Sequence, residues 1–299
     1  MTMMLMKGNG RGWLIRLDAE QKLRPPLSWS NGGLEKPRVI NTVDFGVLEV
    51  AKPYLLASNY DKNYHKLALS LNLDVFPAVM LVRDGVLYLG KWSGGGVDVK
   101  EYSVQLSPSN PDDDDDPSCS KTIKANDYDD VIFYHGKFCS VSQSGKVAAM
   151  DSSFKWKVIA FPVSTSMWWK KEKKKNLVES LGELLLVERH GSTFVAKHCS
   201  VEDMLKTEVK FKVYKLDGVR KQWVEMKGSD LDDRILFVGE DCCFSVSARD
   251  FPGCQGNCIY FSYEVWGKNV ISSRIGVFNL DVGRASPLEA SANIFLPPP

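Results

Sequence analysis

Short apolar runs separated by turn residues are the feature of this sequence that most constrains its fold. Most runs are four to eight residues long and rich in Val, Phe, Tyr and Trp, which are favoured in β-strands. Gly, Asn and Asp stand between them, as they do in tight turns. The clearest runs lie at 183–188, 211–216, 222–226, 235–238, 243–247, 258–261 and 276–280. The pattern predicts an all-β protein.

Several of these runs are joined by glycine turns, which predicts hairpins. Asp84-Gly85 separates two apolar segments, and Gly136 lies inside the run 131–141. Ser144-Gly145 then leads into the apolar stretch 146–151. Helical periodicity is scarce. One short helix is expected over 64–73, and another turn or two over 200–205, beginning at a Ser cap.

The hairpins recur along the chain as a loose internal repeat. They lie near positions 85, 136, 145, 218 and 283, and a Trp-bearing strand follows some of them. Propeller blades of roughly 40–50 residues would fit about six or seven times. We therefore expect a β-propeller-like fold in a single domain over 1–299. A two-sheet sandwich explains the same repeat nearly as well, and the Gly-His…Trp-Asp signature of WD repeats is absent.

The charge balance and the cysteine content restrict the class of partner and the compartment. Lys and Arg total 38 and Asp and Glu total 37, so the sequence has no bulk basic charge for nucleic-acid binding. The longest apolar runs are strand-sized, so no membrane association is expected. The seven cysteines are odd in number and widely spread, as reduced thiols are. These features predict a protein of the cytoplasm, the nucleus or both.

The motif search predicts no catalytic, metal or cofactor site. Cys242, Cys243, Cys254 and Cys258 come closest to a zinc site, but an adjacent pair binds one metal poorly, so buried hydrophobes are the better interpretation. The chain has neither a Gly-x-Ser-x-Gly nucleophile motif nor a His-Glu-x-x-His metal motif. The glycines at 94–96 lack the Lys and Ser/Thr of a phosphate loop. We therefore expect a binding module rather than an enzyme.

One stretch is incompatible with a packed core. Residues 107–118 combine prolines with five consecutive aspartates, a composition typical of a solvated loop. We interpret 107–127 as an acidic loop or linker inserted in the domain.

A second unusual stretch is the only candidate for partner contact. Trp168 and Trp169 are followed by Lys170, Lys171 and further lysines up to Lys175. Trp is favoured at the centres of protein interfaces, and basic clusters attract acidic partners. The alternative is a solvated loop with one Trp folded inward, because charge runs are usually only solvated.

The order of its motifs gives the sequence a family resemblance. It resembles the plant KIB-type β-propeller family, a domain of unknown function typical of plant F-box proteins. The residues that carry this resemblance are 12–17, 129–138, 144–147, 177–187, 211–217, 223–225, 236–239, 244–248, 253–261 and 276–280. The match is more specific after position 125 than before it. The family has no established catalytic residues, so the resemblance assigns none here.

The resemblance implies a protein-interaction module, the substrate-recognition propeller of an SCF-type ubiquitin ligase. The alternative is a stand-alone adaptor or kinase-blocking regulator, since some relatives block a signalling kinase. Relatives carry a helical F-box that binds Skp1 before the motif at 12–17, and eleven residues are too few to build it. We therefore expect a propeller without its F-box, either truncated or stand-alone, and Skp1 binding only if an F-box lies upstream. The aspartate segment falls where a Trp-bearing strand pair is expected, which implies one incomplete blade.

Overall fold

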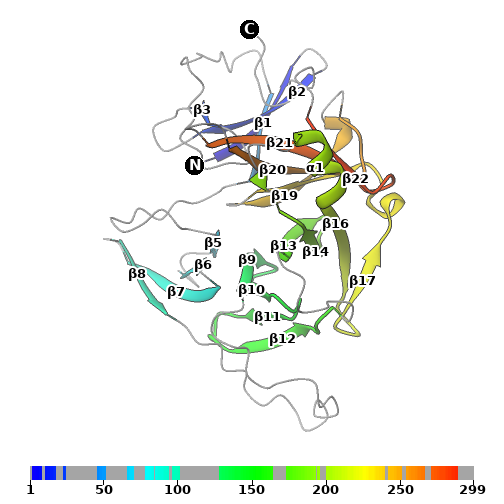
Figure 1. Cartoon of the computed structure of the whole chain (residues 1–299). Coiled ribbons are helices and arrows are strands. Elements are labelled where there is room, and N and C mark those ends of the chain that lie inside the picture. The colour runs from blue at the N-terminus through cyan, green and yellow to red at the C-terminus, as the bar shows by residue number, and fades with distance from the viewer. Residues whose placement is uncertain are drawn as a thin grey trace. The chain divides into compact units, whose positions relative to one another are not determined.

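The structure is a computed structural model of the whole chain (Figure 1). It describes residues 2–8, 11–17, 23–24, 46–51, 66–70, 78–83, 85–93, 96–101, 128–163, 173–192, 194–195, 200–239, 242–250, 254–266 and 271–288. The chain divides into two compact units, which are described separately. The first comprises 1–56, 189–213 and 226–299, and the second comprises 57–188 and 214–225.

Two sheets of the second unit are simple antiparallel meanders. One runs in the order β5 (Lys66–Leu69), β6 (Ala78–Arg83), β7 (Val86–Ser93) and β8 (Gly96–Glu101). The other contains β9 (Tyr128–Tyr134), β10 (Lys137–Ser142), β11 (Val147–Met150) and β12 (Trp156–Ala160), again neighbour beside neighbour. Four strands paired in chain order are the blade pattern of a propeller.

A third sheet has the same order with an insertion. It contains β13 (Lys173–Ser180), β14 (Glu183–His190), β16 (Lys210–Asp217) and β17 (Gln222–Met226). The chain between β14 and β16 holds β15 (Phe194–Val195) and helix α1 (Val201–Glu208). The Ser200 side chain accepts a hydrogen bond from the Asp203 amide at 3.4 Å, which confirms the predicted helix with its Ser cap.

The sheets of the first unit are less regular. The N-terminal sheet has the order β3 (Leu23–Arg24), β2 (Arg11–Leu17), β1 (Thr2–Gly8) and β4 (Gly46–Ala51). The other runs β19 (Cys243–Ser247), β18 (Arg234–Val238), β20 (Cys258–Trp266), β21 (Ile271–Asn279) and β22 (Arg284–Pro287), with β15 paired to β20. Short 3-10 helices η2 (Gly228–Leu231) and η3 (Ala248–Asp250) flank β18 and β19.

Each unit has its own apolar core. In the second unit one cluster joins β5–β7 to the β9–β12 sheet, with Met80, Phe138 and Met150 fully buried. Another lies between the β9–β12 sheet and the β13–β17 sheet and contains Val141 and Leu186. In the first unit, β18–β21 enclose a cluster of aromatic side chains and cysteines. Such burial is the main stabilising contribution in an all-β chain.

Two hairpins of the second unit are closed by two-residue turns with positive φ. His135 and Gly136 join β9 to β10 with φ of 46° and 76°, and Leu181 and Gly182 join β13 to β14 with φ of 53° and 79°. Positive φ at both positions is what a type I′ turn requires, and its twist matches that of the paired strands. Glycine adopts this conformation without a steric penalty, whereas leucine does not.

The strand predictions are confirmed by these elements. The seven clearest runs coincide with β14, β16, β17, β18, β19, β20 and the end of β21. The five glycine turns near 85, 136, 145, 218 and 283 all join consecutive antiparallel strands. The all-β, propeller-like fold class is therefore correct. The described residues form five sheets, so the count of six or seven blades stays a prediction, as do the single domain and the incomplete blade.

The helix predicted over 64–73 is wrong. Residues 66–69 form β5, whose Lys66 and Ala68 are buried while the residues between and after them are half-buried. This alternation has a period of two because β5 pairs with β6 from Lys66↔Val82 to Leu69↔Val79. The short run looked helical because long-range pairing is not visible in a local pattern.

No helix among the described residues has the length and apolar character needed to cross a membrane. The acidic segment 107–127 lies outside the described residues, so its interpretation as an inserted loop stays a prediction.

Candidate functional site

Two consecutive aspartates in β9 hold strand β13 against the β9–β12 sheet. The pairing of β9 with β10 shifts between Val141↔Asp130 and Ser142↔Tyr128, so Asp129 is an extra, bulged residue. Its Oδ2 accepts a hydrogen bond from the Lys175 amide at 3.0 Å. Oδ2 of Asp130 accepts one from the Leu177 amide at 2.7 Å. Alternate amides of β13 are therefore bound by neighbouring carboxylates.

Asp130 also links a third sheet of the same unit. Lys66 Nζ, on β5, lies 2.5 Å from Asp130 Oδ2, and the side chains are 6% and 0% exposed. The other carboxylate oxygen accepts the Val131 amide at 2.6 Å. Burial raises the pKa of Asp130, while Lys66 favours its charged form. A buried carboxylate with this many donors fixes the relative positions of β5, β9 and β13.

The raised pKa of Asp129 predicts that the free energy of unfolding falls as pH rises. Burial raises its pKa from 3.8 to about 6, against the opposing effect of the Lys175 amide. Between these two values the folded state binds more protons than the unfolded state, so unfolding becomes easier as pH rises. We expect the free energy of unfolding of the wild type, relative to that of Asp129→Asn, to fall as pH rises from 3.8 to about 6 and to change little at higher pH. Urea denaturation of both proteins at intervals of half a pH unit measures the difference; a constant difference would contradict the prediction.

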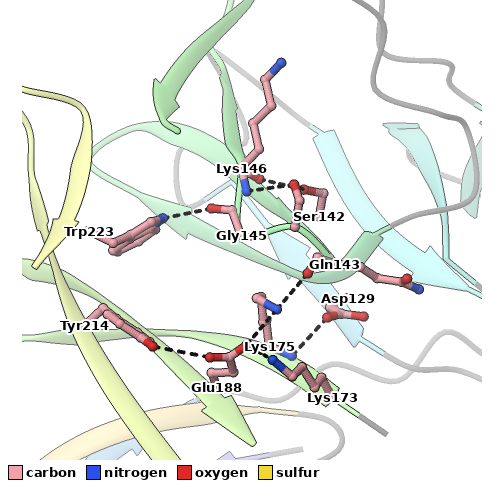
Figure 2. A network of polar contacts seen from close by, with 11 residues as sticks. Asp129, Ser142, Gln143, Gly145, Lys146, Lys173, Lys175, Glu188, Tyr214 and Trp223 are labelled. Atoms are coloured by element: carbon pink, nitrogen blue, oxygen red, sulfur yellow. Dashed lines mark hydrogen bonds and ion pairs between the residues drawn. The ribbon is translucent and has the colours of Figure 1, made fainter. Parts of the chain in front are cut away.

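A second buried network lies beside these aspartates (Figure 2). Lys175 Nζ lies 3.1 Å from Glu188 Oε1 and donates to the Gln143 carbonyl at 2.6 Å. Lys173 Nζ lies 3.6 Å from the same carboxylate oxygen, and the Tyr214 hydroxyl donates to Oε2 at 3.3 Å. Lys175 and Glu188 are each 1% exposed, so this ion pair is part of the core.

Trp223 adds a link of the same kind. Its indole nitrogen donates to the Gly145 carbonyl at 2.8 Å, which joins β17 to the turn between β10 and β11 (Figure 2). Gly145 approaches Val163 so closely that a Cβ would lie 2.8 Å from its side chain. Together the aspartates, the ion pair and the indole hold the β9–β12 and β13–β17 sheets together. They are structural groups, because each binds a partner on another strand or turn of the fold.

An open groove of about 400 Å³ lies at the edge of these two sheets. The β9–β10 turn contributes Tyr134, His135 and Lys137, and β12 contributes Lys157, Val158 and Ile159. The other side is formed by Glu183, Leu184, Leu216, Gly218 and Lys221, with Cys139 and Ala149 completing the lining. The groove is therefore apolar inside and carries three lysines against one glutamate.

The groove walls are held by specific hydrogen bonds. The Tyr134 hydroxyl donates to the Gly182 carbonyl at 2.8 Å, which connects the two type I′ hairpins. The Phe161 amide donates to the Lys221 carbonyl at 2.8 Å, and the Lys221 ammonium lies 5.9 Å from the centre of the Phe161 ring. These bonds fix the distance between the walls, so a ligand would meet a surface that is already formed.

Two groups in the groove, Cys139 and Tyr134, have raised pKa values. Cys139 is the one thiol in the lining, and burial raises its pKa to about 12, so it is protonated at neutral pH. Burial also raises the pKa of Tyr134, with Glu183 adding to the shift. Neither group is activated as a nucleophile or base at neutral pH.

Two turns beside the groove carry exposed apolar side chains. Leu181 precedes Gly182 and is 79% exposed, while Val219 follows Gly218 and is 94% exposed. Leu181 is also in the left-handed region, which is costly for leucine. The Asp217 carboxylate accepts the amides of Val219 and Arg220, both at 3.0 Å, and thereby orders the second turn. Two exposed apolar side chains therefore lie on ordered turns near residues that line the groove.

The unfavourable conformation of Leu181 leads to a stability prediction. Leu181→Asn places the favoured Asn-Gly pair in a type I′ turn and removes an exposed side chain that packs on little. We expect the free energy of unfolding to rise by about 0.5–1 kcal/mol, since asparagine tolerates the left-handed region. Urea denaturation measures it, with Leu181→Val as a β-branched control that should lower stability. Equal stability of the three proteins would show that the turn is unstrained.

The structure does not test the predicted role of the four contact residues. Trp168, Trp169, Lys170 and Lys171 lie outside the described residues, so their role stays a prediction. The interpretation as a solvated loop is wrong for the end of that lysine run, because Lys173 begins β13 and Lys175 is buried against Glu188. A lysine is buried here because its partner lies on the neighbouring strand, which a charge run does not reveal.

The groove lysines Lys137, Lys157 and Lys221 are not among the contact residues that the sequence predicts. They come from three separate turns and strands, so no local motif contains them. The Gly136 turn was the one sequence feature that pointed to any of them, because it predicted the hairpin whose second strand begins with Lys137.

The cysteines lie where the strand pattern predicted. Cys243 lies in β19 and Cys258 in β20, and Cys242 and Cys254 pack against the same apolar cluster. Burial raises the pKa of Cys258 to about 11. Within the described part of the chain no three metal-ligating side chains gather, and the cysteines there are free thiols.

Comparison with known proteins places this architecture in a family. The chain is 29% identical to the Arabidopsis thaliana F-box protein SKIP23, over 96% of this chain and 73% of the relative. It is 27% identical to the Arabidopsis F-box protein At4g35733, over 96% of this chain and 75% of the relative. It is also 32% identical to the Arabidopsis F-box protein At2g17036, over 58% of this chain and 46% of the relative. The family model described as the KIB1-4 beta-propeller matches residues 5–279. The chain therefore belongs to the KIB1-4 β-propeller family.

Proposed function

We propose that this propeller holds a protein substrate for an F-box-type ubiquitin ligase and contributes no catalytic group itself. The observation that carries the proposal is the family match over residues 5–279, together with relatives that are named F-box proteins. The ionic networks that link the sheets, and a groove whose one thiol has a raised pKa, support a binding role. Localisation to the cytoplasm or nucleus, where such ligases act on soluble substrates, is part of the proposal.

The physical basis for partner binding is a rigid scaffold with varied turns. Buried contacts such as Asp130–Lys66 and Lys175–Glu188 fix neighbouring sheets, while Leu181 and Val219 project from the turns. A scaffold whose turns are ordered before binding loses little conformational entropy when a partner docks.

The test has a binding step and a degradation step. The tagged chain is expressed in Arabidopsis cells, and proteins cross-linked to it are identified, purified and titrated against the isolated chain. The chain is then joined to an F-box, and the half-life of the bound protein is followed after synthesis is blocked. We expect saturable binding and a shorter half-life that depends on Skp1.

The two outcomes separate the ligase proposal from its alternative. A partner that binds but keeps its half-life when the F-box is present would favour a stand-alone adaptor or kinase-blocking regulator. Failure to find any saturable protein partner would contradict both. Skp1 binding is expected only for the form that carries an F-box.

A further inference from the structure

We propose that the groove between the β9–β12 and β13–β17 sheets binds an acidic segment of the partner protein, with an apolar side chain inside and carboxylates on the lysines. This inference rests on the proposed function, because it names the chemistry of the segment that the propeller would recognise.

The charge of the groove is local. The chain as a whole has a net charge of +1, yet the groove carries Lys137, Lys157 and Lys221 against Glu183 alone. Glu183 Oε1 is already paired with Lys215 Nζ at 3.0 Å. Within the described residues neither Lys137 nor Lys157 forms an ion pair, and both are exposed. The groove therefore presents positive charge that a partner can neutralise.

The apolar interior of the groove indicates which kind of side chain would accompany the carboxylates of the partner segment. Val158, Ile159, Leu184 and Leu216 line it, and its volume of about 400 Å³ is in the range that accommodates one or two side chains. A purely ionic ligand would leave this apolar surface in contact with water. A segment in which carboxylates flank a leucine or a similar side chain satisfies both parts of the lining.

The turns beside the groove extend the contact. Leu181 lies two positions before the lining residue Glu183, and Val219 follows the lining residue Gly218. Both side chains are highly exposed. Retaining leucine in the left-handed region, where asparagine is favoured, costs stability. A contact with the partner explains why an apolar residue occupies this position.

Nucleic acid is the other polyanion that three lysines attract, and the groove suits it less. Recognition of single strands depends on open aromatic faces on which bases stack. In the groove the Tyr134 ring is already stacked on His135, with ring centres 4.0 Å apart. Besides Tyr134 and His135 the described lining has no aromatic ring, and the chain as a whole carries a net charge of only +1. An acidic protein segment is the better match.

The direct test uses the whole chain and a defined probe. A fluorescein-labelled peptide with the sequence Glu-Asp-Leu-Asp-Glu is titrated by fluorescence anisotropy at low salt. The triple variant Lys137→Glu, Lys157→Glu and Lys221→Glu is compared with Lys227→Glu, which reverses an exposed lysine that does not line the groove. Circular dichroism and urea denaturation check that both variants fold.

We expect the triple variant to lose about 10–100-fold in affinity and Lys227→Glu to lose about twofold or less. Binding of the wild type should weaken as salt is raised, because exposed charge pairs are screened. The matched peptide Gln-Asn-Leu-Asn-Gln should bind at least about tenfold more weakly. Equal affinity of the triple variant and the wild type would overturn the inference, and so would tighter binding of a labelled oligonucleotide than of the acidic peptide.

The protein partner found under the proposed function separates the two claims. If that partner binds the triple variant as tightly as the wild type, the groove inference fails while the proposed function stands. If no partner is found, the proposed function fails, and the peptide titration still decides what the groove binds.

Discussion

Replacement of Asp130 by alanine is expected to lower the free energy of unfolding by about 3–5 kcal/mol, because it leaves the Lys66 ammonium buried without its carboxylate. The change also removes the acceptor of the Leu177 and Val131 amides. Three strands from three sheets lose their common partner at once. Urea denaturation followed by tryptophan fluorescence measures the loss.

Two further variants determine whether the ion pair is the cause. Asp151→Ala removes a half-buried aspartate whose carboxylate bonds within its own turn, to Ser153 and the Lys155 backbone, and should cost about 1 kcal/mol or less. The double variant Lys66→Met with Asp130→Leu replaces the pair by apolar groups and should recover the part of the loss that comes from the buried charge of Lys66. The part that comes from the Leu177 and Val131 amides should remain, because leucine accepts no hydrogen bond. A cost below about 1 kcal/mol for Asp130→Ala would show that the site is hydrated and that the carboxylate is not a link.

Replacement of Phe237 by alanine is expected to have an effect of similar size in the first unit. The Phe237 ring is 0% exposed and stacks on Phe244 and Tyr260, with ring centres 4.8 and 5.1 Å away. Truncation leaves a cavity between β18, β19 and β20, and such cavities cost about 3–5 kcal/mol. Thermal unfolding and urea denaturation give the change.

Two control variants accompany this prediction. One keeps part of the side-chain volume at position 237, and the other truncates an exposed side chain. Phe237→Leu fills part of the space and should cost about half as much as Phe237→Ala. Val282→Ala truncates a side chain that is 64% exposed, and should change stability by less than about 0.5 kcal/mol. A loss for Phe237→Ala no larger than that for Val282→Ala would mean that the aromatic cluster is not a packed core.

The buried ionic groups also bear on function. Asp130 and the Lys175–Glu188 pair fix the sheets that form the groove, so their variants should weaken partner binding only through loss of folded protein. Of the groove lysines, Lys137 and Lys157 are exposed and Lys221 is half-buried, and none of the three belongs to these buried pairs. Stability and binding can therefore be changed separately in this protein, which makes the charge-reversal experiment interpretable.

Local patterns determined most of the secondary structure. Alternating apolar residues between glycine turns predicted β14, β16–β20 and the β9–β10 hairpin, because strand pairing and turn geometry follow from neighbouring residues. The Ser200 cap predicted α1 for the same reason. The order of motifs also led to the family, which the match over residues 5–279 confirms.

Contacts between distant residues were decided by the tertiary structure alone. β5 is a strand, not a helix, because β6 and Asp130 lie beside it, and the latter is 64 positions from Lys66. Lys175 is buried because Glu188 lies on the next strand, although its sequence neighbours suggest a solvated run. The groove combines residues from three hairpins and one edge strand, so no local pattern contains it. The sequence determined most of the strands, and packing between strands decided which charges are buried and which remain available to a partner.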